Sequence, residues 1–186
     1  MALVFNGSSN VITGLAVGGL PDGTVDTDML AAGAVTAPKR GAGAILQIQE
    51  AKTNNRVEMS SSTFAATNLN CSITPISSSN KILVSVSGDQ NTNGDDNEIA
   101  LTVYRSIDGG TYTNLGNGTY GFVTARSNAD RLHSAVSIQF FDSPNTTDSI
   151  NYKLYIARVA GSNGNVEFPV NNGHQYAFMH LSEVAA

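Results

Sequence analysis

The chain has 186 residues, enough for one domain of ordinary size with an appendage and too few for two full domains. Charged residues make up 13% of the sequence, against a usual share of about 25%, and the net charge is -5. Proteins that bind nucleic acid through its phosphates need a basic surface, so this balance excludes that class of partner.

No stretch approaches the run of about 18 apolar residues that a membrane-spanning helix needs. The apolar residues near the N-terminus are scattered among polar ones, and no positive charge precedes them, so no signal peptide is predicted. We therefore expect a chain that is made in the cytoplasm and does not insert into membranes.

Residues 1–43 form an N-terminal segment that differs from the rest, because glycines and alanines interrupt any long periodicity. Thr27 is placed to cap a single helical turn over residues 28–32, which Gly33 would end. The segment is also rich in apolar side chains, such as Leu15 and Leu30, that it cannot bury alone. Two interpretations remain open: a disordered tail, or an extended arm that intertwines with two other copies in a homotrimer.

From Ala44 onward, short strand patterns follow one another at regular spacing, separated by turn residues such as Asp108-Gly109 and Asn117-Gly118. The expected strands span residues 45–52, 57–67, 69–76, 81–88, 98–107, 112–115, 118–126, 133–141, 150–159, 165–170 and 175–184. This spacing predicts an all-β head over residues 44–186, an antiparallel β-sandwich of jelly-roll type.

Alternation within the strands predicts which side chains face the core. Ile150, Tyr152, Leu154 and Ile156 share one face, while Ile82–Leu83–Val84 indicates a strand buried on both faces. Cys71, the only cysteine, lies in the strand-like run with Leu69 and Ile73, so we expect a buried thiol and no intrachain disulfide. Tyr155 and Phe141 fit either a subunit contact or an ordinary surface.

The sequence offers no recognisable catalytic motif. Its three histidines, His133, His174 and His180, stand in no nucleophile or zinc-protease pattern, and no phosphate-binding or dinucleotide-binding loop occurs. We therefore predict a protein that is not an enzyme, with no catalytic residue, no cofactor and no metal.

One acidic segment, residues 89–98 from Asp89 to Glu98, begins like a calcium-binding loop. Asp89, Asn91 and Asn93 precede Gly94, but the closing glutamate is missing because the twelfth position is Ala100. An acidic hairpin loop is the favoured interpretation, and calcium binding stays an alternative.

Five runs occur together along the chain: residues 20–25 (LPDGTV), 30–36 (LAAGAVT), 43–47 (GAILQ), 72–75 with 80–84 (SITP, NKILV) and 179–185 (MHLSEVA). Together they resemble a widespread group of bacteriophage tail-fibre and virion-fibre proteins. The resemblance implies a homotrimeric virion protein in which residues 1–43 attach to other virion proteins and the β-sandwich head faces outward. Its motifs are structural, and they carry no functional residue over to this chain.

Two functions follow as expectations. The first is a short tail fibre whose head binds a host-surface glycan or lipopolysaccharide through weak, multivalent contacts, with the loops 89–98, 108–111, 116–119 and 161–165 as candidates. The second is a capsid decoration or cement protein, in which the N-terminal arm clamps neighbouring shell subunits. In both cases the expected location is the virion.

Overall fold

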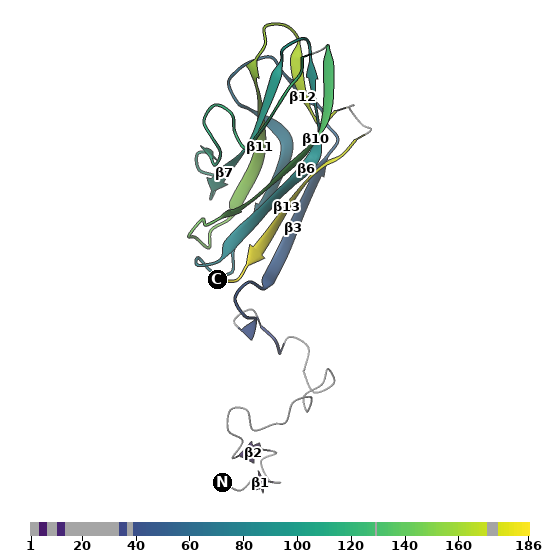
Figure 1. Ribbon diagram of the computed structural model, residues 1–186. Coiled ribbons are helices and arrows are strands. Elements are labelled where there is room, and N and C mark those ends of the chain that lie inside the picture. Colours follow the sequence, from purple (N-terminus) through teal and green to yellow (C-terminus); the bar gives the residue numbers. More distant parts are fainter. Residues whose placement is uncertain (1–3, 7–10, 14–33, 37–38, 129, 171–174) are drawn as a thin grey trace. The chain divides into compact units, whose positions relative to one another are not determined.

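The computed structural model describes residues 4–6, 11–13, 34–36, 39–128, 130–170 and 175–186 (Figure 1). The chain divides into two compact units, Met1–Arg40 and Gly41–Ala186. In the first unit, β1 (Val4–Asn6) pairs antiparallel with β2 (Val11–Thr13), and Phe5 lies opposite Ile12. The predicted helical turn over residues 28–32 lies outside the described residues.

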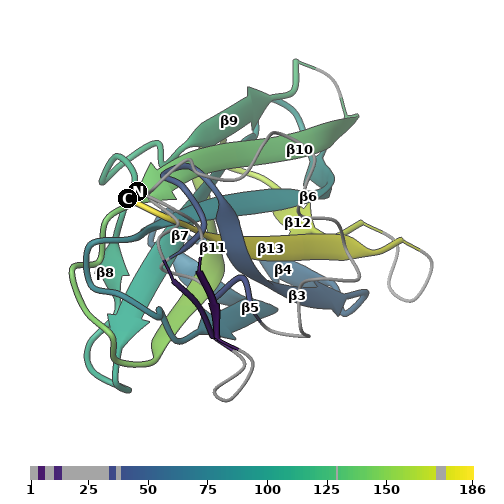
Figure 2. The same cartoon turned by 90° about the horizontal axis from the view of Figure 1, so that it is seen from below.

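The second unit consists of two antiparallel sheets, seen from one end in Figure 2. The first sheet contains β3 (Ile45–Thr53), β4 (Val57–Met59), β6 (Lys81–Asn93), β10 (Arg131–Asp142), β12 (Asn165–Phe168) and β13 (Ala177–Val184). The second sheet contains β5 (Ala65–Ile73), β7 (Glu98–Ile107), β8 (Thr113–Asn114), β9 (Val123–Arg126) and β11 (Ile150–Ala160). The predicted all-β antiparallel sandwich is confirmed. Within the part of the chain that is described, no helix has the length and hydrophobicity to cross a bilayer.

The strand pairing is that of a long hairpin rolled up on itself. Strand β7 pairs with β9, β6 with β10, β5 with β11 and β3 with β13, so that each early strand meets a late one. Side by side, the strands run β3-β13-β6-β10 in one sheet and β5-β11-β7-β9 in the other. This nested order is the jelly-roll topology.

Strand β6 is the longest strand, and it organises the first sheet. Strand β10 occupies one of its edges along residues 82–93, while β13 and β12 share the other edge, opposite residues 81–87 and 91–93. Gly88 lies where the neighbour of β6 changes from β13 to β12. A Cβ atom added to Gly88 would lie 3.0 Å from the Phe168 ring and 3.0 Å from Ala177 Cβ. The absence of a side chain at this position lets Phe168 reach the core.

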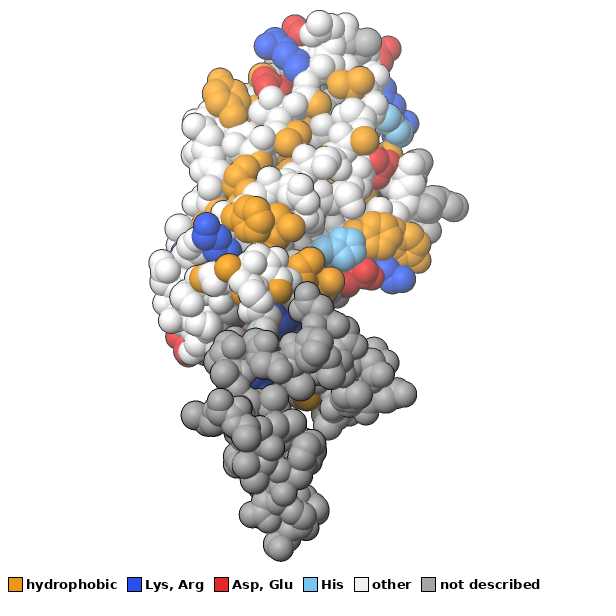
Figure 3. Space-filling view, turned by 60° about the horizontal axis from the view of Figure 1, so that its bottom comes forward, with side chains coloured by type: hydrophobic (Ala, Val, Ile, Leu, Met, Phe, Trp, Pro, Cys, Tyr) orange, Lys and Arg blue, Asp and Glu red, His pale blue; other side chains and the backbone are white. Residues whose placement is uncertain are grey.

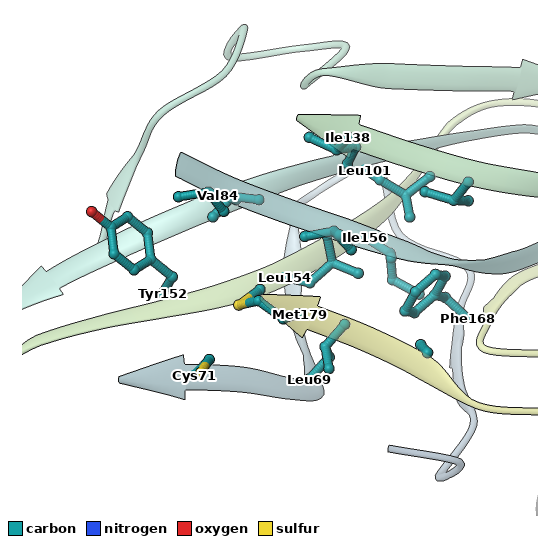
Figure 4. Packing of buried hydrophobic residues seen from close by; sticks show 14 of the residues in the cluster. Leu69, Cys71, Val84, Leu101, Ile138, Tyr152, Leu154, Ile156, Phe168 and Met179 are labelled. Atoms are coloured by element: carbon teal, nitrogen blue, oxygen red, sulfur yellow. The ribbon is translucent and has the colours of Figure 1, made fainter. Parts of the chain in front are cut away.

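The core lies between the two sheets, as Figure 4 shows. Ile82, Val84 and Val86 of β6 point into it and are at most 2% exposed. They meet the predicted face of β11, whose members Ile150, Tyr152, Leu154 and Ile156 are fully buried. Burying one such side chain contributes about 1.5–3 kcal/mol, so this alternation is the main source of stability.

Two predictions about individual strands are wrong. The expected strand over residues 57–67 is two strands, because the turn at residues 60–64 separates β4 from β5, and β5 then continues through the expected break at Asn68. The expected burial of Leu83 on both faces of its strand is not found. Leu83 lies half-buried on the outer face of β6, while its neighbours Ile82 and Val84 face the core.

Candidate functional site

The two ends of the sandwich differ in what they carry. At one end β3 begins and β13 finishes, and the backbone joins them through Gly43 N to Ala185 O and Ala185 N to Ala44 O, both 2.9 Å. Because β6 starts beside the end of β13 and runs antiparallel to it, the β6–β7, β9–β10 and β11–β12 connections lie at the opposite end (Figure 1). We call these the terminal end and the loop end.

Asn97 holds the loop end together. Its side-chain Nδ2 donates to the backbone oxygen of Asn93 and to that of Asn163 at 2.5 Å, which ties the β6–β7 connection to the β11–β12 connection. The β9–β10 connection joins them through Gly94 N to Asp130 O, 2.7 Å, and Ser127 N to Asn97 O, 2.9 Å. Three connections that are distant in sequence therefore form one surface.

Two of the four predicted candidate loops meet at this surface, those at residues 89–98 and 161–165. The turn of residues 108–111 lies at the terminal end, where Asp108 N donates to Ser149 O at 2.8 Å. Its φ angles, 48° at Asp108 and 70° at Gly109, fit the predicted Asp-Gly hairpin turn. In residues 116–119, Asn117 Oδ1 accepts hydrogen bonds from Thr119 N and Tyr120 N, so that segment is closed on itself.

The segment 89–98 is not the ten-residue loop that the sequence suggested. Residues 89–93 belong to β6 and residue 98 begins β7, so that the connection is residues 94–97. The oxygens that would open a calcium loop also accept from protein donors, because Asp89 Oδ1 accepts from Val170 N at 3.3 Å and Asn91 Oδ1 from Arg131 Nε at 3.1 Å. Among the described residues, no three His, Cys, Asp or Glu side chains are grouped closely enough to hold a metal ion.

Polar atoms are buried beneath the loop end. Five of them have no hydrogen-bond partner among the described residues: Gln90 Oε1, Asn91 Nδ2, Thr92 Oγ1, Asn97 Oδ1 and Glu167 Oε2. Arg56 Nη1 lies 3.5 Å from Glu167 Oε2, as an ion-pair contact. A buried polar atom without a partner lowers the free energy of unfolding by about 1–3 kcal/mol. In a polar interior, ordered water usually provides the missing hydrogen bond. The loop end is thus polar inside as well as outside.

A second feature is a group of aromatic side chains on the outer face of the second sheet, which we call the tyrosine face: Phe64, Tyr104, Tyr112 and Tyr155. The rings of Tyr104 and Tyr155 stack with centroids 4.0 Å apart, and Tyr112 lies 6.2 Å from Tyr155. Burial, followed by the neighbouring Tyr112 and Tyr104, raises the pKa of Tyr155, so its hydroxyl stays neutral. Tyr155 was singled out from the sequence, whereas Tyr104 and Tyr112 were not.

Amide and hydroxyl groups flank the tyrosine face. The hydroxyl of Tyr112 donates to Asn151 Oδ1 at 2.7 Å, and Asn151 Nδ2 donates to Ser72 Oγ at 2.8 Å. Lys153 Nζ lies 5.1 Å from the centre of the Tyr112 ring, a cation–π contact. This surface combines ring edges, amides and one cation.

Two of the three histidines lie in strands, as the expected strands over residues 133–141 and 175–184 predict. His133 lies in β10 and His180 in β13, where His180 Nε2 is 2.9 Å from Glu50 Oε2. His174 is outside the described residues.

No protein-family model matches the chain, and no curated protein matches it. Among solved structures, a chain from "Structure of infectious bursal disease virus Gx strain" is similar, with a TM-score of 0.33 and 12% sequence identity. The match covers 76% of this chain and 37% of that chain.

Proposed function

We propose that this chain is a structural, non-enzymatic virion protein of a bacteriophage, a short tail fibre that attaches through residues 1–43. In this proposal the chain forms a homotrimer, and its head binds a host-surface glycan or lipopolysaccharide. The sequence resemblance suggests the virion role. The geometry of the head supports attachment at one end and ligand binding at the other.

The observation that carries the proposal is the placement of the chain ends on the head. Gly43 and Ala185 are hydrogen-bonded at the terminal end, whereas the Asn97-linked connections lie at the loop end. A head tethered at one end keeps the other end free to reach a partner. Loops held on a rigid sandwich commonly carry recognition.

The polar groups of residues 161–164 suit a ligand that offers hydroxyl groups, such as a glycan. Residues 161–164 (Gly-Ser-Asn-Gly) are exposed and carry a hydroxyl and an amide, and the neighbouring connection offers Asn97 beneath them. Such groups exchange hydrogen bonds with sugar hydroxyls in shallow contacts. Each contact is weak, so several copies on one particle would provide the avidity.

Immunolabelling of intact particles, viewed by electron microscopy, tests the virion role. Label at the tail supports the fibre. Label over the shell supports the alternative, a capsid decoration protein, and overturns the fibre. Particles without label overturn the virion role altogether.

Binding of the labelled full chain to host cells, in competition with purified lipopolysaccharide, tests the loop end. We expect Ser162→Glu, at the loop end, to weaken binding at least tenfold, because the longer anionic side chain covers the contact surface and repels the phosphate groups of lipopolysaccharide. Ser143→Glu, on the exposed β10–β11 connection at the terminal end, is the matched control and should bind as the wild type. Equal binding by both variants would contradict the assignment to the loop end.

A further inference from the structure

The outer face of the first sheet carries an apolar row that crosses all four of its long strands. Ile48 of β3 lies opposite Ser182 of β13, Ser182 lies opposite Leu83 of β6, and Leu83 lies opposite Phe141 of β10. Directly paired residues point to the same side of a sheet, so these four side chains form one line. We call it the outer row.

The two ends of the outer row are open to solvent in the isolated chain, and Leu83 between them is half-buried. Ile48 is 58% exposed and Phe141 is 59% exposed, and at the two ends of the same face Ile45 is 52% and Tyr176 is 48% exposed. The outer face of an antiparallel sheet is ordinarily polar when water covers it. Among the described residues, the outer face of the second sheet contributes no large hydrophobic side chain with comparable exposure.

Most side chains beside the outer row on β6 and β10 are uncharged. Ser85, Ser137 and Gln139 occupy the adjacent positions of β6 and β10, and Gln139 Nε2 donates to Ser85 Oγ at 3.1 Å. Two charged groups of this face stand on β3 and are engaged, Glu50 with His180 and Lys52 over the Tyr176 ring at 5.3 Å. A third, Lys81 of β6, is exposed and lies opposite Val184 of β13. Figure 3 shows hydrophobic side chains gathered on this face with few charged ones between them. A second molecule would meet no concentration of one charge.

The face also has a suitable size. Four strands spaced about 4.8 Å apart and about eight residues long, at roughly 3.4 Å per residue, give a flat area of about 500 Å². Protruding side chains add to the accessible area, and a standard interface buries about 800 Å² on each partner. One sheet face therefore supplies most of the surface that a stable contact between copies requires.

We propose that a neighbouring copy of this chain covers the outer face of the β3-β13-β6-β10 sheet, with Ile48, Leu83 and Phe141 at the centre of the contact. The sequence pattern Ile82–Leu83–Val84 fits this assignment, because it is typical of a strand buried on both faces and the chain itself buries only one. The inference names the surface for the self-association proposed above, and it does not depend on the virion role.

Sedimentation equilibrium and light scattering on the full chain test the proposal. We expect the wild type to be oligomeric and Ile48→Lys and Phe141→Lys to dissociate at least tenfold more readily, because each places a charge in the contact. Tyr120→Lys is the matched control. Tyr120 is 54% exposed but lies on the β8–β9 connection, and this variant should stay oligomeric.

Thermal unfolding followed by circular dichroism shows whether each variant is folded. If a lysine variant unfolds, Ser182→Arg provides a second test, because it places a long cation at the centre of the outer row on a neutral position. A monomeric wild type would overturn the proposal. Folded lysine or arginine variants that keep the wild-type assembly would also overturn it, because the contact would then lie elsewhere. Dissociation of Tyr120→Lys to the same extent as these variants would overturn it as well.

Discussion

Asn80 and Glu183, 103 positions apart in the sequence, are joined by a hydrogen bond of 2.6 Å from Asn80 Nδ2 to Glu183 Oε1. The same oxygen accepts from Ile76 N at 2.7 Å, and Glu183 Oε2 accepts from Gln47 Nε2 at 2.6 Å. Glu183 is fully buried at the terminal end of the sandwich. One carboxylate thus fastens the β5–β6 corner and β3 to the last strand.

This arrangement predicts acid sensitivity. Burial alone would raise the pKa of Glu183, but hydrogen bonds from Asn80, Gln47 and the backbone of Ile76 and Ser77 outweigh it and hold the pKa below its ordinary value. The stabilisation is present above the unfolded-state pKa of about 4.3, and it is lost as the pH falls through the lower, folded-state pKa. Glu183→Gln should lower the free energy of unfolding by about 2 kcal/mol at pH 7 and flatten its fall in acid.

Urea denaturation of both proteins between pH 7 and pH 2 measures this difference. Other carboxylates titrate in the same range, so the quantity that matters is the gap between wild type and variant, which should close in acid. A gap that is independent of pH would show that Glu183 contributes through shape alone.

A partly buried carboxylate connects the two sheets. Asp142 of β10 lies 2.8 Å from Arg105 of β7, and the hydroxyl of Tyr152 in β11 donates to Asp142 Oδ2 at 2.6 Å. Burial, with Asp142 as the next cause, raises the pKa of Tyr152, so the hydroxyl remains a donor. Tyr152→Phe should cost about 1.5–3 kcal/mol of the free energy of unfolding, because the lost bond is to a charged group.

A double-mutant cycle separates this bond from packing. With Asp142→Asn as the second substitution, Tyr152→Phe should cost less than it does in the wild type, because the acceptor is no longer charged. Tyr120→Phe, on an exposed connection, should change nothing measurable. Equal costs in both backgrounds would assign the effect to the packing of the hydroxyl group and not to its hydrogen bond with Asp142.

Replacement of one glycine at the loop end should destabilise the protein. Gly161 has a φ of 90°, and a Cβ there would lie 2.0 Å from Asn97 Oδ1. Gly161→Ala should therefore combine backbone strain with displacement of Asn97, and lower stability by about 2–4 kcal/mol. Gly118 has open space around its Cβ position, so Gly118→Ala is the control, and thermal unfolding reports both. Similar melting temperatures for the two variants would contradict the packing at Asn97.

The single thiol should be inert in the folded protein. Cys71 is 6% exposed, and burial is the main cause that raises its pKa, with a smaller effect in the same direction from Glu50. The thiolate is the reactive form, so a disulfide reagent should label Cys71 slowly in buffer and fully in urea. Rapid labelling in buffer would mean that β5 opens readily.

Much of the fold could be predicted because alternation and turn residues act locally. The alternation of apolar residues every second position predicts the buried face of Ile150 and Tyr152, which is confirmed. The tolerance of Asp and Gly for positive φ predicts the turn at Asp108-Gly109, which is also confirmed. The predicted break at Asn68 is a bulge inside β5 and not a strand end, because the pairing with β11 passes from Asn70 opposite Lys153 to Ala66 opposite Tyr155. Thr67 Oγ1 accepts from Leu69 N and donates to Leu154 O, and these bonds hold β5 to β11 at the bulge.

The candidate site was harder to predict than the fold. Turn residues mark loops but not which loops meet, and the pairing through Asn97 joins residues 66 positions apart. Leu83 shows a second limit. The pattern Ile82–Leu83–Val84 predicts burial on both faces, but the chain covers only the inner face and leaves Leu83 half-buried on the outer one.

The position of β13 affects how the head is made. This strand follows both β3 and β6 in the sequence, and it lies between them in the finished sheet. Until translation delivers residues 177–184, neither β3 nor that edge of β6 has its partner, and both remain available to strands from other nascent chains. The first sheet can therefore close only after residues 177–184 have been made, and removing them would leave it without an inner strand.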